Sequence, residues 1–455
     1  MKRYHPPTQS LLRLGQVAED RPIWGLPALT VASLALLAVL AILADHAVAA
    51  NLLPLPTWAL DGTVDDFRTL LSTIAAASIS VIALVFSSSL VVLQLASSQF
   101  GPFLLRLFMR SRITGLTLGV FVGIFLYSLF VLASLVGATF VPRIAATICL
   151  ALVVISMALL LAFIYNISVS VQSPRVAAVV AGDLWRAIDD VRRRHEADGW
   201  TMGADDPQAP DIKHAIARLT TDGASVAAEQ SGFIVYVDHQ QLVRATERAD
   251  ATLRLLHQRG RFVLAGEPIA NVWPSERATG ALMDELAKAV VIGPERTLRQ
   301  DLEFAIDRLV QISLLALSPA INNTFNALIC IDWLSEGVRA LAQYPCDWII
   351  YRDGGGALRV LDQPHPITEV IEAAFNKVRQ ASARNTAVTT HLLTTLGRLS
   401  VWLTAEDQQA ALVAQADAVV EGALVEITVE KDRAAIRASD ERFREAIAHA
   451  ARLPH

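Results

Sequence analysis

Four long apolar runs constrain this chain more than any other feature of its sequence. They cover roughly residues 24–44, 71–97, 113–140 and 144–171. Each is close to or longer than the ~20 residues that a helix needs to cross a bilayer. The chain has 455 residues, of which 53% are hydrophobic and only 18% charged, and the apolar excess lies before residue 173. We therefore expect four transmembrane helices within residues 23–172.

The remainder of the chain has the composition of a soluble protein. Residues 1–22 form a short N-terminal arm ahead of the first apolar run. After the transmembrane domain we expect an α/β subdomain with small β-sandwich-like hairpins over 173–300, and a mainly helical subdomain with one hairpin over 301–455. The predicted fold class is thus an α-helical membrane domain followed by a cytoplasmic domain of mixed α+β type.

Basic residues flank the apolar runs unevenly, and this bias predicts the orientation. They gather in the N-terminal arm, between the second and third runs, and after the fourth: Lys2, Arg3, Arg13, Arg21, Arg106, Arg110, Arg112, Arg175, Arg186, Arg192, Arg193 and Arg194. The opposite loops hold only Arg68 and Arg143, and acidic residues crowd the first of them. Loops rich in Lys and Arg stay in the cytoplasm, so we expect both termini to be cytoplasmic.

Polar side chains recur every seven residues along the second apolar run. Thr73, Ser80, Ser87 and Gln94 share one face of a helix, and Ser98 continues that face one turn further. One interpretation is a packing seam, because Ser and Thr hydroxyls bond to carbonyls of their own helix and small polar residues let helices pack closely. The other is a pore wall, and we take these five residues as candidate pore-lining positions.

The third run begins with three glycines at four-residue spacing, Gly115, Gly119 and Gly123. Glycine is costly inside a helix unless a close backbone approach compensates, so this spacing predicts tight helix–helix packing. Between the two runs, Gly101 and Pro102 should break or bend the second helix. The following Phe, Leu and Arg residues predict an interfacial helix near 102–112.

Strand and helix patterns alternate in the region after the membrane domain. Residues 212–228 and 240–256 are predicted to be helical, and residues 232–238 to form a strand. Residues 261–265 and 268–272 are predicted to pair as a hairpin about Gly266. That hairpin resembles those of biotinyl and lipoyl carrier domains, which need a carrier lysine. No lysine occurs between Phe233 and Trp273, so we expect no prosthetic group.

The second half of this region has a helix over 298–317, interrupted by Ser318 and Pro319. Asn322 or Asn323 is a plausible N-cap of the next helix, and freed amide groups at such a helix start could also hold a ligand. Three consecutive glycines, Gly354 to Gly356, predict a hairpin turn rather than a phosphate cradle, because no GKS or GKT follows. Three helices are predicted to end the chain.

Several classes of function have little support in the sequence. The net charge of −5 and the lack of a basic aromatic patch argue against nucleic-acid binding. The ten histidines and three cysteines are scattered, and the nucleophile elbow and HExxH motifs do not occur. We therefore expect no enzyme, no metal site and no cofactor.

Two stretches carry a resemblance to a known family: SSQFGPFLLRLFMRSRITGLTLGVFVG and RLVQISLLALSPAINNTFNALICIDWL. They resemble the bacterial predicted membrane proteins of domain-of-unknown-function family 2254, along nearly the whole chain. The family pattern has an arginine before Ser-Pro-Gly-Ile-Asn-Asp-Pro, and this chain departs from it at Leu315, Ala320, Asn323 and Thr324. The resemblance implies a bacterial inner-membrane protein with a cytoplasmic domain, and it implies no mechanism.

We expect a passive ion or small-solute channel, gated through its cytoplasmic domain. A single chain with four helices leaves little room for a conduit, so we expect a homo-oligomer with cyclic symmetry in the lipid bilayer. The alternative is a non-conducting membrane scaffold or sensor whose cytoplasmic domain binds a protein partner or small ligand.

Overall fold

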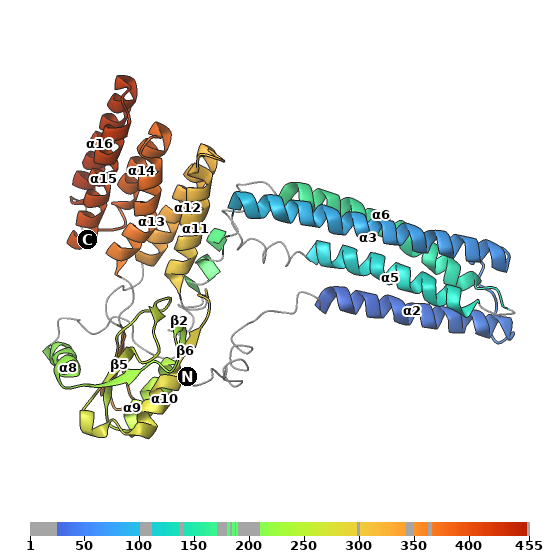
Figure 1. The fold of residues 1–455 in the computed structure, drawn as a ribbon, viewed down its shortest axis with the longest axis horizontal. Coiled ribbons are helices and arrows are strands. Elements are labelled where there is room, and N and C mark those ends of the chain that lie inside the picture. The colour runs from blue at the N-terminus through green and yellow to red at the C-terminus, as the bar shows by residue number, and fades with distance from the viewer. Residues whose placement is uncertain are drawn as a thin grey trace, which may run out of the picture. The chain divides into compact units, whose positions relative to one another are not determined.

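The chain forms two compact units, Met1–Gln172 and Ser173–His455. The computed structural model describes residues 25–100, 112–135, 140–170, 210–297, 301–342, 349–362 and 366–452, with short pieces of 180–189. The interfacial helix expected near 102–112 therefore lies almost wholly outside the described residues. Figure 1 labels the α-helices of both units and some of the strands of the second.

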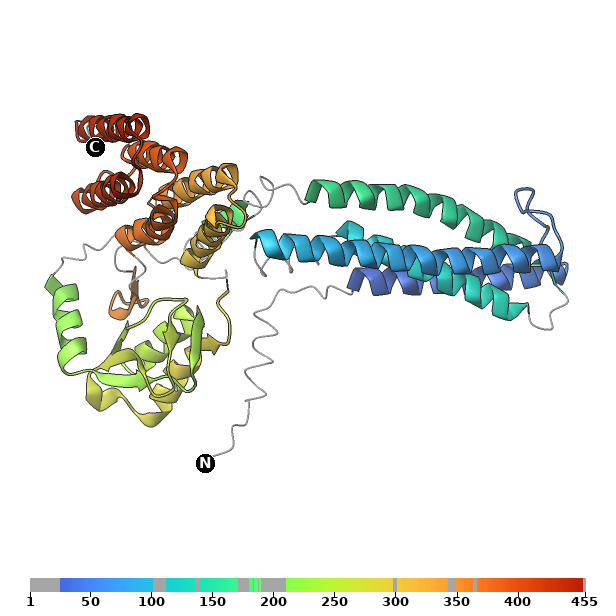
Figure 2. The same cartoon turned by 45° about the horizontal axis from the view of Figure 1, so that its top comes forward.

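The first unit consists, within the described residues, of four long helices. These are α2 (Gly25–Ala49), α3 (Val64–Phe100), α5 (Arg112–Ser134) and α6 (Arg143–Ser170). All four are long and apolar enough to cross a membrane. The prediction of four helices is confirmed, but α3 begins at Val64 rather than residue 71, and α5 ends at Ser134, short of residue 140. α5 packs against the other three helices, and Figure 2 shows the four running side by side.

Glycines of α5 produce the closest helix contact in this unit. A Cβ atom added at Gly119 would lie 2.0 Å from Thr30 Oγ1 of α2, and one added at Gly123 would lie 2.5 Å from Leu34 Cδ1. Gly115 lies on the same face, where an added Cβ would meet Pro27 Cγ at 3.4 Å. The absence of side chains at these positions lets the two backbones approach closely.

A buried carboxylate joins α2 to the first turn of α6. Asp45 is 2% exposed, and its Oδ1 and Oδ2 accept the N–H groups of Ile144 and Ala145, each at 2.9 Å. The first amides of a helix have no partner within the helix itself. Asp45 therefore acts as the cap of a neighbouring helix, and Tyr127 of α5 adds a bond from its hydroxyl to the Ala145 carbonyl (3.0 Å).

The second unit begins with a region of two sheets. Its elements are α8 (Pro210–Thr221), β1 (Ala224–Ala227), β2 (Gly232–Val237), α9 (His239–Arg248), β3 (Thr252–Leu255), β4 (Phe262–Val263), β5 (Pro268–Trp273), the 3-10 helix η1 (Ser275–Arg277), α10 (Gly280–Ala289) and β6 (Val290–Gly293). Among the described residues, one sheet has the order β1-β5-β3-β8-β7 and the other β4-β2-β6. Their shared core contains Val226, Leu253, Val263 and Ile292.

The expected hairpin about Gly266 is wrong. β4 pairs with β2, whereas β5 pairs with β1 and β3, so the chain changes sheets at this turn. Gly266 has a φ of +86°, and its N–H bonds to the Ala228 carbonyl of the neighbouring chain segment. Sequence alternation marks both strands, but their partners are chosen by packing between distant segments.

Two predicted helices in this region are shorter than expected. The first, α8, ends at Thr221, and residues 224–227 form strand β1 instead. The second, α9, ends at Arg248, because Asp250 adopts a positive φ of 48° and starts the turn into β3. In both cases a strand that pairs with β5 replaces the last part of the predicted helix.

The helical part of the second unit comprises α11 (Leu302–Leu317), α12 (Thr324–Ala342), α13 (Ile367–Ser382), α14 (Thr386–Leu399), α15 (Glu406–Glu426) and α16 (Glu430–Ala450). Four helices, not three, therefore follow residue 366 in the described chain. The hairpin of β7 (Ile349–Arg352) and β8 (Leu358–Asp362) forms as predicted. It belongs to the five-stranded sheet rather than to the helical part, because β8 pairs in parallel with β3.

Candidate functional site

The polar repeat of α3 lies on the outer surface of the four-helix unit. Thr73, Ser80, Ser87 and Gln94 are all exposed in the single chain. The buried positions of the same helix, including Leu71 and Ser78, lie roughly half a helical turn away. We call the four exposed residues the α3 ridge. Packing within one chain leaves this ridge uncovered, and the side chain of Ser98 lies outside the described residues.

Two hydroxyls of the α3 ridge bond to their own helix. Thr73 Oγ1 donates to the Thr69 carbonyl at 2.8 Å, and Ser80 Oγ donates to the Ala76 carbonyl at 3.1 Å. A hydroxyl has one proton and two acceptor lone pairs. With the proton turned to the backbone, each hydroxyl oxygen presents only acceptor capacity to its surroundings.

The outward faces of α2 and α6 are different in character. Their exposed side chains are large and apolar, such as Leu29 of α2 (68% exposed) and Val154 and Leu161 of α6 (66% each). Such faces suit lipid. The α3 ridge is interleaved with Leu84 and Val91, yet it alone among these three faces carries a regular series of hydroxyl and amide groups.

The turn between α11 and α12 holds the two asparagines singled out in the sequence. Asn323 Oδ1 accepts the N–H of Asn326 (3.2 Å), so Asn323 caps α12 as expected. Asn322 is exposed and has a positive φ of 44°, and its N–H bonds to the Ser318 carbonyl at 2.9 Å. The N–H groups of Asn322 and Asn326 are thus already engaged in the turn and the cap.

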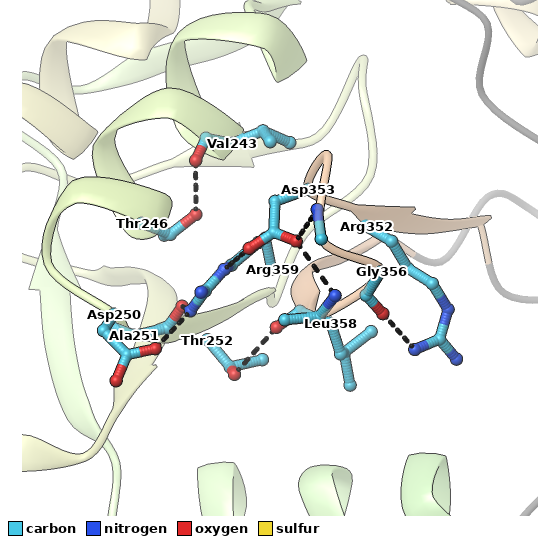
Figure 3. A network of polar contacts seen from close by, with 12 residues as sticks. Val243, Thr246, Asp250, Ala251, Thr252, Arg352, Asp353, Gly356, Leu358 and Arg359 are labelled. Carbon is cyan, nitrogen blue, oxygen red and sulfur yellow. Dashed lines mark hydrogen bonds and ion pairs between the residues drawn. The ribbon is translucent and has the colours of Figure 1, made fainter.

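The glycine turn between β7 and β8 is organised by one aspartate (Figure 3). Asp353 Oδ1 accepts the N–H groups of Gly355 and Ala357, each at 2.9 Å. Its Oδ2 accepts the Nε of Arg359 at 2.6 Å, and Arg359 Nη1 reaches Asp250 Oδ1 at 3.0 Å. These amides point at a carboxylate of the same chain, and the arrangement is a closed structural network.

A second buried ionic cluster lies at the end of β8. Asp362 is 1% exposed, and its Oδ2 accepts a hydrogen bond from Arg259 and lies 2.9 Å from His239 Nε2. Burial raises the pKa of Asp362, but the charges and hydrogen bonds of Arg259 and His239 outweigh burial and hold the pKa well below its usual range. The ring of His239 stacks on Tyr351 with centroids 4.7 Å apart. This cluster ties α9 to β7 and β8.

Metal-binding side chains do not gather in the part of the chain that the structure describes, where no group of three or more His, Cys, Asp or Glu could hold an ion. Cys149 and Cys330 are free and buried, and Cys346 lies outside the described residues. The α3 ridge therefore remains the strongest candidate site in the described chain.

Four apolar helices followed by a folded unit of helices and two sheets define a helical membrane protein with a large appended unit. The chain belongs to the family described as Predicted membrane protein (DUF2254), whose model matches residues 20–398. This confirms the resemblance that the two quoted stretches indicated.

Similar proteins occur in mycobacteria. An uncharacterized protein of Mycobacterium bovis is 30% identical over 403 residues, covering 85% of this chain and 74% of the relative. An uncharacterized protein of Mycobacterium tuberculosis matches with the same identity and coverage. No solved structure matches the chain.

Proposed function

We propose that several copies of this chain assemble around an axis in the bilayer and form a passive channel for ions or small solutes. The α3 ridges face the axis and line the pathway with hydroxyl and amide groups. The observation that carries the proposal is that the ridge points away from its own four-helix unit. A face with Thr73, Ser80, Ser87 and Gln94 meets either lipid or a different surface, and water or a second helix satisfies it better than lipid.

The packing of the single chain supports assembly in copies. α5 occupies the centre of the four helices and fills it with buried side chains, including Ile124, Tyr127 and Val131. A conduit within one chain would have to displace that core, whereas a conduit between chains needs only the surface that is already exposed. Closed cyclic symmetry is the common way to arrange such copies.

The proposal includes a location and an orientation. The chain sits in the inner membrane of a bacterium with both termini cytoplasmic, because Lys and Arg concentrate in the arm, in the link after α3 and beyond α6. The unit Ser173–His455 then lies in the cytoplasm, where it can regulate the pathway.

A second candidate is a non-conducting scaffold or sensor that binds a partner through the second unit. One observation favours it: the hydroxyls of Thr73 and Ser80 are already bonded to their own backbone. Hydroxyls satisfied in this way can pack against another helix without water.

Conductance of the purified full-length protein in planar bilayers tests the proposal. Ser87→Trp places an indole on the α3 ridge and should reduce single-channel conductance severalfold. Val154→Trp is the matched control, because Val154 of α6 is also exposed but lies on an apolar face. If Ser87→Trp conducts like the control, the ridge does not line the pathway. If the wild type never conducts under voltage, tension or pH change, the scaffold is favoured.

A further inference from the structure

The polar repeat of α3 extends to a charged residue at the start of the helix. Asp66 lies seven residues before Thr73, and like the members of the α3 ridge it is exposed. Two helical turns separate successive members, which places Asp66 on the same face, about 10 Å along the axis from Thr73. The series is therefore Asp66, Thr73, Ser80, Ser87 and Gln94, with one carboxylate at its end.

Two exposed acidic residues near Asp66 pair with arginines. Asp65 pairs with Arg68 at 3.0 Å, and Asp61 pairs with Arg143 at 2.8 Å. Among the residues that the structure describes, no basic side chain pairs with Asp66. Of the exposed aspartates Asp61, Asp65 and Asp66, the one without a basic partner in the described residues is thus the one that continues the α3 ridge.

The position of the Asp66 carboxylate is fixed by the cap of α3. Its Oδ2 accepts the N–H of Thr63 at 2.9 Å and the Thr63 hydroxyl at 2.7 Å, while the Asp66 N–H donates to Thr63 Oγ1 at 3.3 Å. This reciprocal arrangement is a capping box. The cap uses only Oδ2 of the Asp66 carboxylate, and Oδ1 takes no part in it.

The ridge beyond Asp66 also presents acceptors. The hydroxyl protons of Thr73 and Ser80 point to backbone carbonyls, so the oxygen lone pairs face outward. Oxygen acceptors coordinate cations and repel anions. A fixed carboxylate and a row of outward oxygens, observed independently, both point to a positively charged permeant species.

We propose that Asp66 makes the pathway selective for cations over anions, an inference that rests on the proposed channel. In a cyclic assembly each copy contributes one Asp66, and the carboxylates form a ring at one mouth. The Debye length is about 8 Å at physiological ionic strength, so the field of the ring spans the mouth and nearly reaches the level of Thr73. The ring concentrates cations there and depletes anions.

Reversal potentials in a KCl gradient across a planar bilayer test the assignment with the full-length protein. Asp66→Asn should lower the K⁺ to Cl⁻ permeability ratio by a factor on the order of ten, because Asn can still accept the Thr63 N–H while removing the charge. Asp66→Glu should restore selectivity. Asp65→Asn removes the same charge at the adjacent residue, which is paired with Arg68 and lies off the ridge, and it should lower the ratio less than Asp66→Asn does.

The outcomes separate this proposal from the channel itself. A wild-type channel with equal K⁺ and Cl⁻ permeability, or an Asp66→Asn channel with an unchanged ratio, would overturn the role of Asp66 and leave the channel standing. If Asp66→Asn does not fold, the wild type alone tests the proposal. Selectivity that comes from a charged ring must weaken as KCl rises from about 0.01 M to 1 M, because salt screens the charges. A K⁺ to Cl⁻ permeability ratio that stays constant over this range would overturn the proposal. Complete absence of conductance would overturn both.

Discussion

Replacing Asp45 with alanine should destabilise the membrane unit strongly. Asp45 lies near the C-terminal end of α2 and caps α6 in the buried interior, with one carboxylate oxygen for each of two amides, those of Ile144 and Ala145. The substitution Asp45→Ala removes both acceptors at once. Because Asp45 is 2% exposed, water does not readily replace them.

The magnitude follows from the two amides. Leaving a buried N–H without an acceptor costs about 1–3 kcal/mol, so Asp45→Ala should lower the free energy of unfolding by about 2–6 kcal/mol. Asp45→Asn keeps one acceptor oxygen and should cost about half as much. The order Asp, Asn, Ala is thus the expected order of stability.

Thermal and denaturant unfolding of the full-length protein in one detergent, followed by tryptophan fluorescence, measures these differences. Asp61→Ala is the control, because Asp61 is 86% exposed and its bond to Arg143 should be worth at most about 1 kcal/mol. If Asp45→Ala unfolds within the range of this control, Asp45 is not the cap that holds α2 to α6, and the reasoning fails.

Two further predictions concern other contacts. Gly119→Ala should lower the free energy of unfolding by about 1–3 kcal/mol, because the added Cβ would meet Thr30 Oγ1 and the backbone of Pro27. Gly354→Ala is the control and should change little, because a Cβ added there meets open space. If the two variants have equal melting temperatures, the close packing of α5 on α2 is refuted. Acid should weaken the second unit through Asp362. Arg259 and His239 depress its folded pKa, so its contribution is complete above the unfolded value of about 4 and is lost as pH falls below that. Asp362→Asn leaves Arg259 buried without a charge partner, so it should lower the free energy of unfolding by about 3–5 kcal/mol at pH 7. The variant should also lose less stability than the wild type between pH 5 and pH 2. If both lose stability with the same slope over that range, the role assigned to Asp362 is contradicted.

Local features of the chain were predictable where they depended on neighbours in the sequence. The apolar runs and the cap at Asn323 are properties of single segments. The four-residue spacing of Gly119 and Gly123 predicted close helix packing, although it did not identify α2 as the partner. The hairpin about Gly266 was wrong because the partners of β4 and β5 lie in different sheets, and pairing between distant segments does not show in the local sequence. The role of Asp45 was missed for the same reason, since it bonds to residues about a hundred positions away.

The candidate site was predictable only in part. The seven-residue spacing identified the polar positions of α3, and the same spacing extends to Asp66. Asp66 was missed because it follows the aspartates of the preceding loop closely in the sequence. Which face of α3 is buried could not be read from this spacing, because Ser78 is also polar and yet lies in the core. The pairing of Asp61 with Arg143 depends on how α6 returns to the start of α3.

The sequence by itself determined that this chain has four helices suited to a bilayer and that one of them carries a polar series, because length, hydropathy and helical period are properties of single segments. Only the tertiary structure decided which side of that helix is covered, which aspartates are neutralised, and which strands pair. Those outcomes depend on contacts between distant segments, and their energies arise only when the packed helices exclude water from one face and leave the other exposed.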